Sequence, residues 1–282
     1  MKDLTAAGIV LYNPDINRMK ENINAIINQV DYVILVDNGS KNNPDIEAAI
    51  EHSFHISDKL IIKFSQKNNG IAWALNQIFT IAEEQSVKWV LTLDQDSVCP
   101  SDIIESYIKY SASISKSKIG ILCPTIVDKN AGILEGDVHK TEEIKRCITS
   151  GSFTSLVAWK QLSGFDEKMF IDGVDFDFCD RLRMNGYKII RIGSISLTHE
   201  LGKITTHRFL FKTVKVQNHS ALRKYYIVRN RFYLSRKEKN PFAIITSFFF
   251  VIKFSATIVL FEKNRRKKLK AVLKGMCDGL KL

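Results

Sequence analysis

The chain has 282 residues, of which 45% are hydrophobic, 10% aromatic and 25% charged. This length is enough for one sizeable core with an appendage. The formal net charge is +11, and five cysteines, odd in number, far apart and without a Cys-x-x-Cys pair, argue against a disulfide framework or a zinc site.

The charge is distributed unevenly along the chain. Residues 1–202 hold 21 Lys and Arg against 27 Asp and Glu, and residues 203–282 hold 20 against 3. This asymmetry indicates a polyanionic partner for the C-terminal part, either a nucleic acid or an anionic membrane surface. The N-terminus leads directly into a strand-like run, so we expect no signal peptide. The cysteine pattern predicts reduced thiols in a cytosolic protein.

The first hundred residues alternate strand and helix patterns. A buried strand is expected over 6–11, and further strands over 32–36, 60–64 and 89–93. Helices are expected over about 14–29, from 43 onward, and over 70–84. This order predicts an α/β fold with a mostly parallel sheet and helices on both faces. Right-handed crossovers bring the loops after these strands to one edge, where we expect a polar, acidic pocket. Those loops contain Tyr12-Asn13, Asp37-Asn38, Asn68-Asn69 and Asp94 to Asp96.

Beyond Pro100 the pattern is mixed. In chain order we expect a strand over 119–122, a polar loop or hairpin over 128–143, a turn at Ser150-Gly151-Ser152, a short helix over 155–162, a turn at 164–167, a helical segment within 170–186 and a strand over 189–197.

Asp94-Gln95-Asp96 ends the apolar run that begins at Trp89. Carboxylates at the carboxyl edge of a parallel sheet lie where open α/β folds bind ligands. Mg²⁺ typically takes one or two protein carboxylates together with phosphate oxygens, so this pair suits a cation that also holds a diphosphate. An isolated Asp-x-Asp is also typical of a simple strand-end turn, and the motifs around it favour the binding site.

Several short motifs follow one another between about residues 5 and 235. They are Val36-Asp37-Asn38-Gly39-Ser40, Asn68-Asn69-Gly70-Ile71-Ala72, Ala74-Leu75-Asn76, Leu91 to Ser97, Gly164 to Glu167, Phe170 to Asp172, Val174 to Cys179, Arg181 to Arg183, Gly186-Tyr187, His199 to Gly202, and Arg223 through Arg231. Together they resemble family 2 glycosyltransferases of the GT-A fold, and among those the bacterial rhamnosyltransferases that build surface polysaccharides.

The resemblance implies a GT-A catalytic domain over 1–202, with a nucleotide-sugar half over about 1–100 and an acceptor half over about 101–202. A basic helical region, 203–282, follows. It also implies that Asp37 accepts a hydrogen bond from N3–H of a uracil or thymine ring, although the same side chain can simply cap the Asn38-Gly39 turn. Free N–H groups where the helix opens at Asn69-Gly70 can meet the nucleotide.

Donor and metal residues follow from the same motifs. The nucleotide and donor side is expected to comprise Asn13, Asp37, Asn38, Asn69, Gly70, Asp94 and Gln95. Asp94, Asp96 and His199 are expected to hold Mg²⁺ or Mn²⁺, which would neutralise the diphosphate leaving group. A lone histidine is also often structural, and that alternative stays open for His199.

The family acts by direct displacement with inversion, which requires a base on the acceptor side. Asp175 is the candidate, with Asp172 and Asp177 as rivals, and an aspartate in a first helical turn can instead be a cap. Relatives usually have a Glu-Asp pair where this chain has Val174-Asp175, so a neighbouring charge that could tune the base is missing. Gly151, Ser152 and Asp172 are expected on the acceptor side.

Residues 242–261 form a mostly apolar stretch long enough to span a bilayer. Lys253 in its middle opposes spanning, because a mid-bilayer lysine costs about 2.5 kcal/mol or more. With Thr246 and Thr257 it makes a polar stripe, which favours a helix in the membrane interface or one packed on the catalytic domain. The basic residues that follow favour an anionic leaflet; they are Lys263, Arg265, Arg266, Lys267, Lys268 and Lys270.

We therefore expect an inverting glycosyltransferase that moves L-rhamnose from dTDP-β-L-rhamnose to an undecaprenyl-diphosphate-linked precursor of O-antigen, capsule or a similar polymer. The nearest alternative keeps the reaction but uses a UDP-hexose donor, such as galactose, glucose or an amino sugar. A non-catalytic module that binds nucleotide sugars or membranes is a further alternative. The chain lacks the base-stacking and helix-turn-helix motifs of nucleic-acid binders, so a nucleic-acid-binding function is not favoured. The expected location is the cytoplasmic face of a bacterial inner membrane.

Overall fold

The computed structural model describes residues 3–54, 59–113, 118–128, 132–135, 137–198, 205–209, 212–238 and 241–282. The chain folds into two compact units. The first comprises Met1–Lys168 and Val174–Glu200, and the second comprises Met169–Gly173 and Leu201–Leu282. The short segment Met169–Gly173 thus packs with the C-terminal part, although it lies between two stretches of the first unit.

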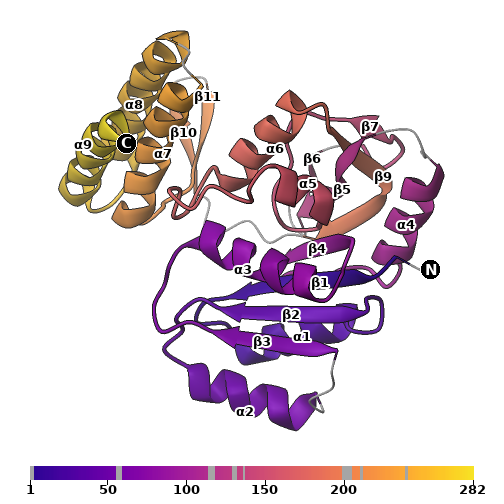
Figure 1. Cartoon of the computed structure of the whole chain (residues 1–282). Coiled ribbons are helices and arrows are strands. Elements are labelled where there is room, and N and C mark those ends of the chain that lie inside the picture. The colour runs from indigo at the N-terminus through magenta and orange to yellow at the C-terminus, as the bar shows by residue number, and fades with distance from the viewer. Residues whose placement is uncertain are drawn as a thin grey trace. The chain divides into compact units, whose positions relative to one another are not determined.

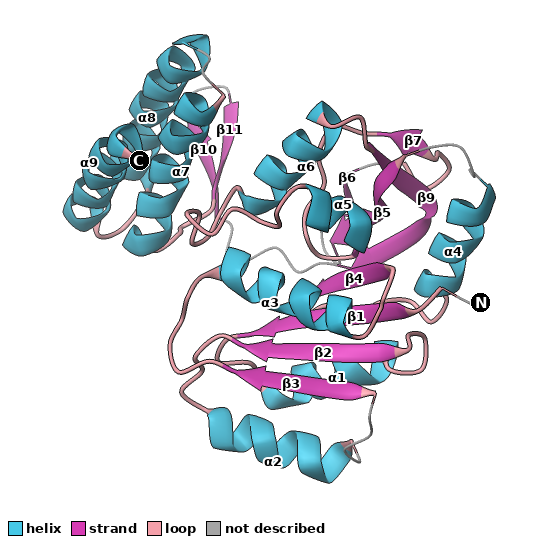
Figure 2. Cartoon of the chain, in the orientation of Figure 1, coloured by secondary structure: helices cyan, strands magenta, loops and turns pink. Residues whose placement is uncertain are grey.

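The first unit is built on one sheet whose N-terminal half is parallel (Figures 1 and 2). Its strand order is β3-β2-β1-β4-β8-β5-β9-β7, with β6 paired to β5. The parallel strands are β1 (Thr5–Leu11), β2 (Tyr32–Asp37), β3 (Leu60–Phe64) and β4 (Trp89–Asp94). The helices that connect or follow them are α1 (Ile16–Ile26), α2 (Asn43–Ser53), α3 (Ile71–Glu84) and α4 (Ile103–Ser113). The predicted α/β order with a mostly parallel sheet is confirmed.

The rest of the sheet mixes directions. β8 (Ser152–Ser155) runs antiparallel between β4 and β5 (Ile119–Asp128), and β5 is parallel to β9 (Lys188–Thr198). β6 (Gly132–Glu135) returns along β5, which makes a hairpin of the expected polar segment, and β7 (Glu142–Glu143) pairs with β9. α5 (Leu156–Gln161) and α6 (Val174–Met184) complete the unit.

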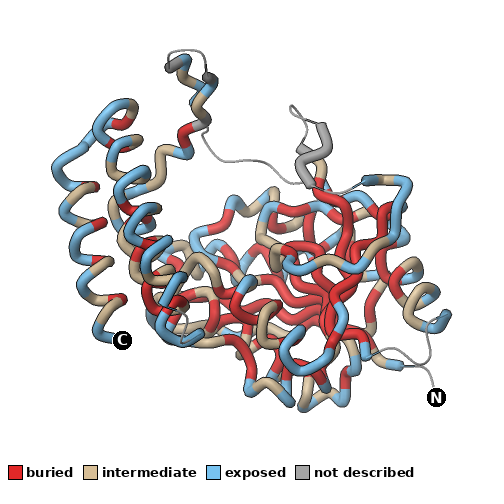
Figure 3. Tube along the Cα trace, turned by 90° about the horizontal axis from the view of Figure 1, so that it is seen from above, coloured by how far each residue is buried: buried red, intermediate tan, exposed pale blue. Residues whose placement is uncertain are grey.

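Alternate residues of the central strand face different helices, as the two-residue period of a strand requires. Ala7, Ile9 and Leu11 join a buried cluster with residues of α1, α2 and α4. Gly8 faces the other way, and a Cβ there would lie 2.2 Å from Ile78 Cγ2 of α3. The central strand β1 is therefore buried on both faces, and it lies in the buried core that Figure 3 shows in red.

The described part of the second unit contains an antiparallel pair, β10 (Thr205–Phe209) and β11 (Lys212–Val216), and three helices. The helices are α7 (Ala221–Lys237), α8 (Pro241–Phe261) and α9 (Arg265–Lys281). A small buried cluster joins them through Val228 and Phe232 of α7, Val251 and Ile258 of α8, and Val272 of α9. At Gly275 a Cβ would lie 2.4 Å from the Tyr225 carbonyl oxygen, so this glycine lets α9 lie directly on the backbone of α7.

A buried ion-pair triad ties the three helices together. Glu262 follows α8, and its two carboxylate oxygens lie 2.7 Å from Lys224 Nζ and 2.6 Å from Lys268 Nζ. Lys268 is therefore not part of an exposed basic run, which corrects the expectation drawn from the sequence. Its immediate neighbours, from Lys263 to Lys267 and at Lys270, are exposed.

α8 has two different faces. By length and composition alone it could cross a membrane, with a mean hydropathy of 2.2 and only 17% of its most apolar window buried. Ser247, Val251 and Ile258 face α7 and α9, whereas large apolar side chains on the other face are exposed. Those exposed side chains are Phe242, Ile245, Phe248, Phe249, Ile252, Val259 and Leu260. The helix thus packs by one side and leaves an apolar face of aromatic and aliphatic residues uncovered within the second unit.

Candidate functional site

Hydrogen bonds join the loops at the carboxyl ends of β1, β2 and β4. Tyr12 N donates to Gln95 Oε1 at 2.9 Å, which links the loop after β1 to the Asp94–Asp96 turn. Asn13 N donates to Ser40 Oγ at 2.7 Å, and Asn13 Oδ1 accepts from Lys41 N at 2.8 Å. Asn13 is also one of the few non-glycine residues with a positive φ, 48°. Asn13 and Gln95, which were predicted to bind the sugar nucleotide, therefore hold the loops of this edge together.

Asp37 is fully buried at the end of β2. Its Oδ2 accepts from Gly39 N at 3.1 Å and Ser40 N at 3.0 Å, so the capping role is present in the structure. Its Oδ1 is also buried, and no hydrogen-bond partner for it occurs among the described residues. A buried carboxylate oxygen without a donor is costly, and an incoming N–H group would offset that cost. Both roles expected for Asp37 are thus compatible, because they use different oxygens.

Asn38 connects this edge to the start of α3. Its Nδ2 donates to Asn68 Oδ1 and to the Gly70 carbonyl, both at 3.1 Å, and its Oδ1 accepts from Asn69 N at 2.9 Å. The Asn69 side chain donates to Ser65 Oγ and the Lys67 carbonyl, so it shapes its own loop. Gly70 has φ of 92° and precedes the first turn of α3, a conformation that favours glycine.

The Asp94–Asp96 turn is supported from two sides. Asp94 N donates to Ser150 Oγ at 3.3 Å, and the Asp94 carbonyl accepts from Asn22 Nδ2 at 2.7 Å. Asp94 is half-buried and Asp96 is exposed. Neither Asn22 nor Ser150 was predicted to support this turn. The available signal for Asn22 was a polar residue at a buried position of an amphipathic helix, between Met19 and Ile26.

The donor set at this turn fits Mg²⁺ or Mn²⁺ in part. Asp94 and Asp96 supply two carboxylates, and such cations commonly complete their shell with waters and substrate phosphates. Among the described residues no three His, Cys, Asp or Glu side chains converge on one point. β9 is described up to Thr198, which pairs with Val98, and His199, the third predicted ligand, lies outside the described residues.

The turn at residues 150–152 contacts the Asp94–Asp96 turn. Ser150 Oγ also lies 2.9 Å from Ser97 Oγ, and both side chains are buried. Gly151 has φ of 79°; its N donates to the Thr92 carbonyl and its carbonyl accepts from Tyr107 Oη, both at 2.8 Å. Ser152 Oγ donates to the Ile148 carbonyl at 2.6 Å. The polar groups of Gly151 and Ser152, expected to contact the acceptor, bond here within the fold.

Asp175 lies in the first turn of α6 and is half-buried. It lines a small pocket with room for about one water molecule. The other lining residues include Thr92, Ser152, Phe165, Cys147 and Cys179. The two thiols lie 3.8 Å apart. Contact with Cys147 and burial raise the pKa of the Cys179 thiol, and the nearby charge of Asp175 adds to that effect. Cys179 is consequently protonated near neutral pH.

The two rivals of Asp175 are held in ion pairs. Asp177 is buried, and its Oδ2 lies 2.7 Å from Arg181 Nε. Asp172 belongs to the second unit, where its carboxylate accepts from Arg223 Nε and Nη2 at 2.9 to 3.2 Å. Asp172 and Asp177 are therefore both engaged in ion pairs, while Asp175 lines the pocket described above.

Comparisons with known proteins agree with the resemblance found in the sequence. The profile described as Glycosyl transferase family 2 matches residues 7–182. A curated relative, the dTDP-rhamnosyl transferase RfbF of Shigella flexneri, is 27% identical over 304 residues, covering 98% of this chain and 95% of the relative. The similarity thus extends beyond the catalytic motifs into the C-terminal helices.

Solved structures are similar in fold. TarS 1-349 from S. aureus has a TM-score of 0.59 at 13% identity, covering 98% of this chain and 80% of that chain. The mannosyltransferase PcManGT from Pyrobaculum calidifontis, in complex with GDP-Man and Mn²⁺, has a TM-score of 0.60 at 12% identity, covering 99% and 88%. At such identities the likeness concerns the fold alone, and it confirms the expected GT-A type.

Proposed function

The chain belongs to glycosyl transferase family 2, and on that premise we propose that it transfers L-rhamnose from dTDP-β-L-rhamnose to a lipid-linked oligosaccharide, with inversion. The observation that supports this most is the junction of three loops at one sheet edge. There, beside the Asp94–Asp96 turn, Asp37 keeps a buried oxygen that no described residue contacts by a hydrogen bond. The relative named as a dTDP-rhamnosyl transferase supports the choice of donor sugar.

On the side of the sugar nucleotide, Asp37 Oδ1 accepts a hydrogen bond from N3–H of the thymine ring. This contact favours a pyrimidine that carries a hydrogen on N3 over one that does not. Hydrogen bonds of Asn13, Asn38 and Gln95 connect the loops of this edge, and they keep Asp37 Oδ1 and the Asp94–Asp96 turn at a fixed distance from each other. Asp94 and Asp96, with His199 as the proposed third ligand, would hold Mg²⁺ or Mn²⁺, which supplies charge neutralisation for the diphosphate leaving group.

On the acceptor side, Asp175 takes the proton of the attacking hydroxyl. That oxygen forms a bond to the anomeric carbon as the bond to the diphosphate breaks, so the configuration inverts. Val174 is buried and apolar, so the position before the base carries no second carboxylate that could tune it. The lipid-linked acceptor belongs to O-antigen, capsule or a similar surface polymer.

Location follows from the second unit. We propose that residues 203–282 attach the enzyme to an anionic inner-membrane surface, because α8 exposes an apolar face and is followed by exposed basic residues. The lipid-linked acceptor is anchored in the same surface.

A donor screen tests the activity. Purified protein with Mg²⁺ or Mn²⁺ is mixed with dTDP-, UDP- and GDP-sugars and a lipid-linked glycan acceptor, and products are detected by mass spectrometry. We expect transfer from dTDP-rhamnose, its loss in EDTA, and recovery with added metal. Transfer from UDP-hexoses alone would contradict the rhamnose donor and support the alternative, a UDP-hexose donor.

Asp175→Asn tests the base. Losing a general base typically costs about 10²- to 10⁴-fold in rate, so we expect turnover to fall in that range while dTDP binding is retained. Asp180→Asn on the same helix is a matched control, because Asp180 is paired with Arg146. Unchanged turnover in Asp175→Asn would exclude the base role. Nucleotide binding without transfer from any donor would favour a non-catalytic module.

A further inference from the structure

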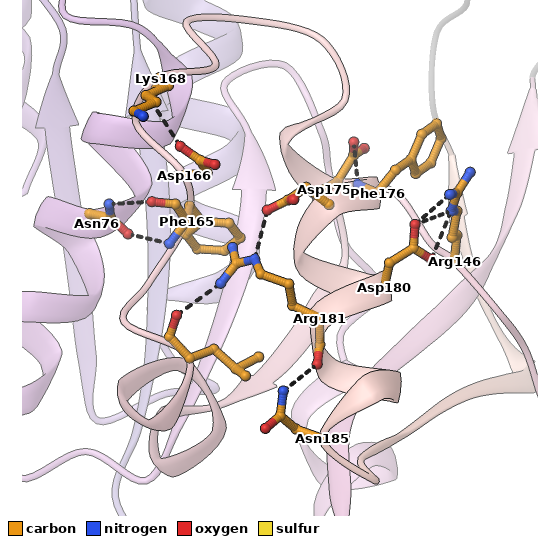
Figure 4. A network of polar contacts seen from close by, with 12 residues as sticks. Asn76, Arg146, Phe165, Asp166, Lys168, Asp175, Phe176, Asp180, Arg181 and Asn185 are labelled. Carbon is orange, nitrogen blue, oxygen red and sulfur yellow. Dashed lines mark hydrogen bonds and ion pairs between the residues drawn. The ribbon is translucent and has the colours of Figure 1, made fainter. Parts of the chain in front are cut away.

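Asn76, in the second turn of α3, uses its whole side-chain amide to bind a segment that lies far along the sequence. Its Oδ1 accepts from Phe165 N at 2.8 Å and from Trp159 Nε1 at 3.1 Å. Its Nδ2 donates to the Phe165 carbonyl at 2.9 Å and to Glu167 Oε1 at 2.7 Å. An amide offers two acceptor and two donor positions, and all four are occupied here. Figure 4 shows Asn76 bonded to both backbone groups of Phe165.

The adjoining residues are shaped to allow this approach. Gly164 has φ of 75°, and a Cβ there would lie 2.6 Å from Asn76 Oδ1, closer than real contacts permit. Trp159 is 9% exposed and stacks on Phe79 of α3 with ring centroids 5.3 Å apart.

Phe165 carries the connection onward to α6. Its ring lies 5.6 Å from that of Phe79 and 4.5 Å from that of Phe178, between centroids. Phe178 is one helical turn after Asp175, and Phe165, Phe178 and Asp175 line the same pocket. All these residues belong to the first unit. Packed aromatic rings transmit displacement, because protein interiors are close-packed.

We propose that Asn76 is a positioning residue that fixes the first turn of α6, and so Asp175, relative to α3, whose own first turn lies at the donor edge. This rests on the proposed function, in which Asp175 is the base. Asn76 contacts no substrate. Its hydrogen bonds hold Phe165 in the place from which it supports α6, so its loss shifts the base away from the acceptor hydroxyl without altering the nucleotide contacts.

The test is Asn76→Asp, which keeps the acceptor oxygens but removes both N–H donors and sets a carboxylate against the Phe165 carbonyl and Glu167. A misplacement near 1 Å can cost about 100-fold in rate, so we expect kcat for transfer to fall tenfold or more, with the dTDP dissociation constant within twofold of wild type. Adding Glu167→Gln restores one donor to this pair, and we expect the double variant to recover part of the lost kcat.

Gln77→Glu is the matched control, because it also replaces an amide by a carboxylate, at the next position of α3. Gln77 Oε1 accepts from Lys63 Nζ, and the glutamate carboxylate can accept the same hydrogen bond. We expect wild-type kcat there. Thermal melts of all variants separate misfolding from misplacement. Unchanged kcat in Asn76→Asp, or a loss that follows nucleotide affinity, would overturn the positioning role. If the wild-type protein itself transfers no sugar, the proposed function fails instead of the positioning role. Nucleotide binding, measured on the wild-type protein and on Asn76→Asp, distinguishes a failure of the proposed function from a failure of the positioning role.

Discussion

Residues of one chemical type have different roles in this protein because the fold surrounds them differently. Asp37, Asp175 and Asp177 are all aspartates near the expected site. Asp177 is paired with Arg181, Asp175 lines a pocket, and Asp37 has one oxygen bonded to backbone N–H groups and one without a partner in the described chain. Burial and hydrogen bonding therefore give chemically identical side chains different surroundings.

Asp37→Asn tests the nucleotide contact. If the new amide points its N–H group at the thymine N3–H, one hydrogen bond to a charged group is lost, which is worth about 1.5–3 kcal/mol. We expect dTDP binding by calorimetry to weaken by about tenfold or more.

The control is Asp31→Asn, just before the opposite end of the same strand, where the carboxylate accepts from Thr5 N. It should leave dTDP affinity unchanged. Equal affinity in Asp37→Asn and wild type would remove Asp37 from the nucleotide site.

At the scale of the elements, the helices of the second unit depend on the buried carboxylate of Glu262. Glu262 joins α7 and α9 through Lys224 and Lys268, and the Lys224 ammonium also lies 4.3 Å from the centroid of the Phe254 ring of α8. Burial alone would raise the pKa of Glu262, but the two ammonium groups outweigh it and lower the pKa below its ordinary value.

Glu262→Gln should destabilise this helical unit. Removing one partner of a buried ion pair typically costs about 3–5 kcal/mol, and here two lysines lose their counter-charge. We expect faster amide hydrogen exchange in α7 and α9, measured by mass spectrometry. Glu238→Gln, at an exposed position after α7, is the control and should change stability by less than about 0.5 kcal/mol.

The same charge predicts a pH dependence. A carboxylate whose pKa is lowered on folding contributes stability that is present above its unfolded pKa, about 4.3, and is lost as the pH falls through the lowered folded value. We therefore expect protection of α7 and α9 to decline below about pH 4 in wild type, and this component of the decline to be absent in Glu262→Gln. Identical acid profiles would contradict the role of the triad.

For the whole molecule, the division into two units matches a division of charge, with the positive excess after residue 202. The exposed residues Phe242, Ile245, Phe249, Ile252 and Val259 of α8 follow one another at intervals of three, four, three and seven positions, which places them on one helical face. An apolar helical face next to basic residues is typical of a helix that lies in the membrane interface.

We expect full-length protein to co-sediment with vesicles containing anionic lipid, more weakly with neutral vesicles, and less at about 0.5 M salt than at about 0.1 M, because salt screens the basic residues. Phe249→Ser with Ile252→Ser should reduce binding by about tenfold or more, since burying one such side chain contributes about 1.5–3 kcal/mol.

Leu222→Ser is the matched control, since Leu222 is a 62% exposed apolar residue on α7. Its vesicle binding should equal that of wild type. Binding that ignores lipid charge, or an α8 face that instead mediates self-association in sedimentation experiments, would contradict the proposal. Preferential co-sedimentation with DNA would point to a nucleic-acid partner.

The sequence by itself determined the strands and helices of residues 5–94 and their order, because local apolar periods and Asn-Gly or Asn-Pro boundaries are short-range signals. The helix α4 and the strands β8, β10 and β11 were not predicted. The sequence also determined the family, through motifs such as Asp94-Gln95-Asp96. Only the tertiary structure decided what these residues touch: the surroundings of the two Asp37 oxygens, the burial of Lys268, and the four hydrogen bonds of Asn76. The partners of Lys268 and Asn76 come from other elements of the fold, and which groups meet is decided by packing rather than by local pattern.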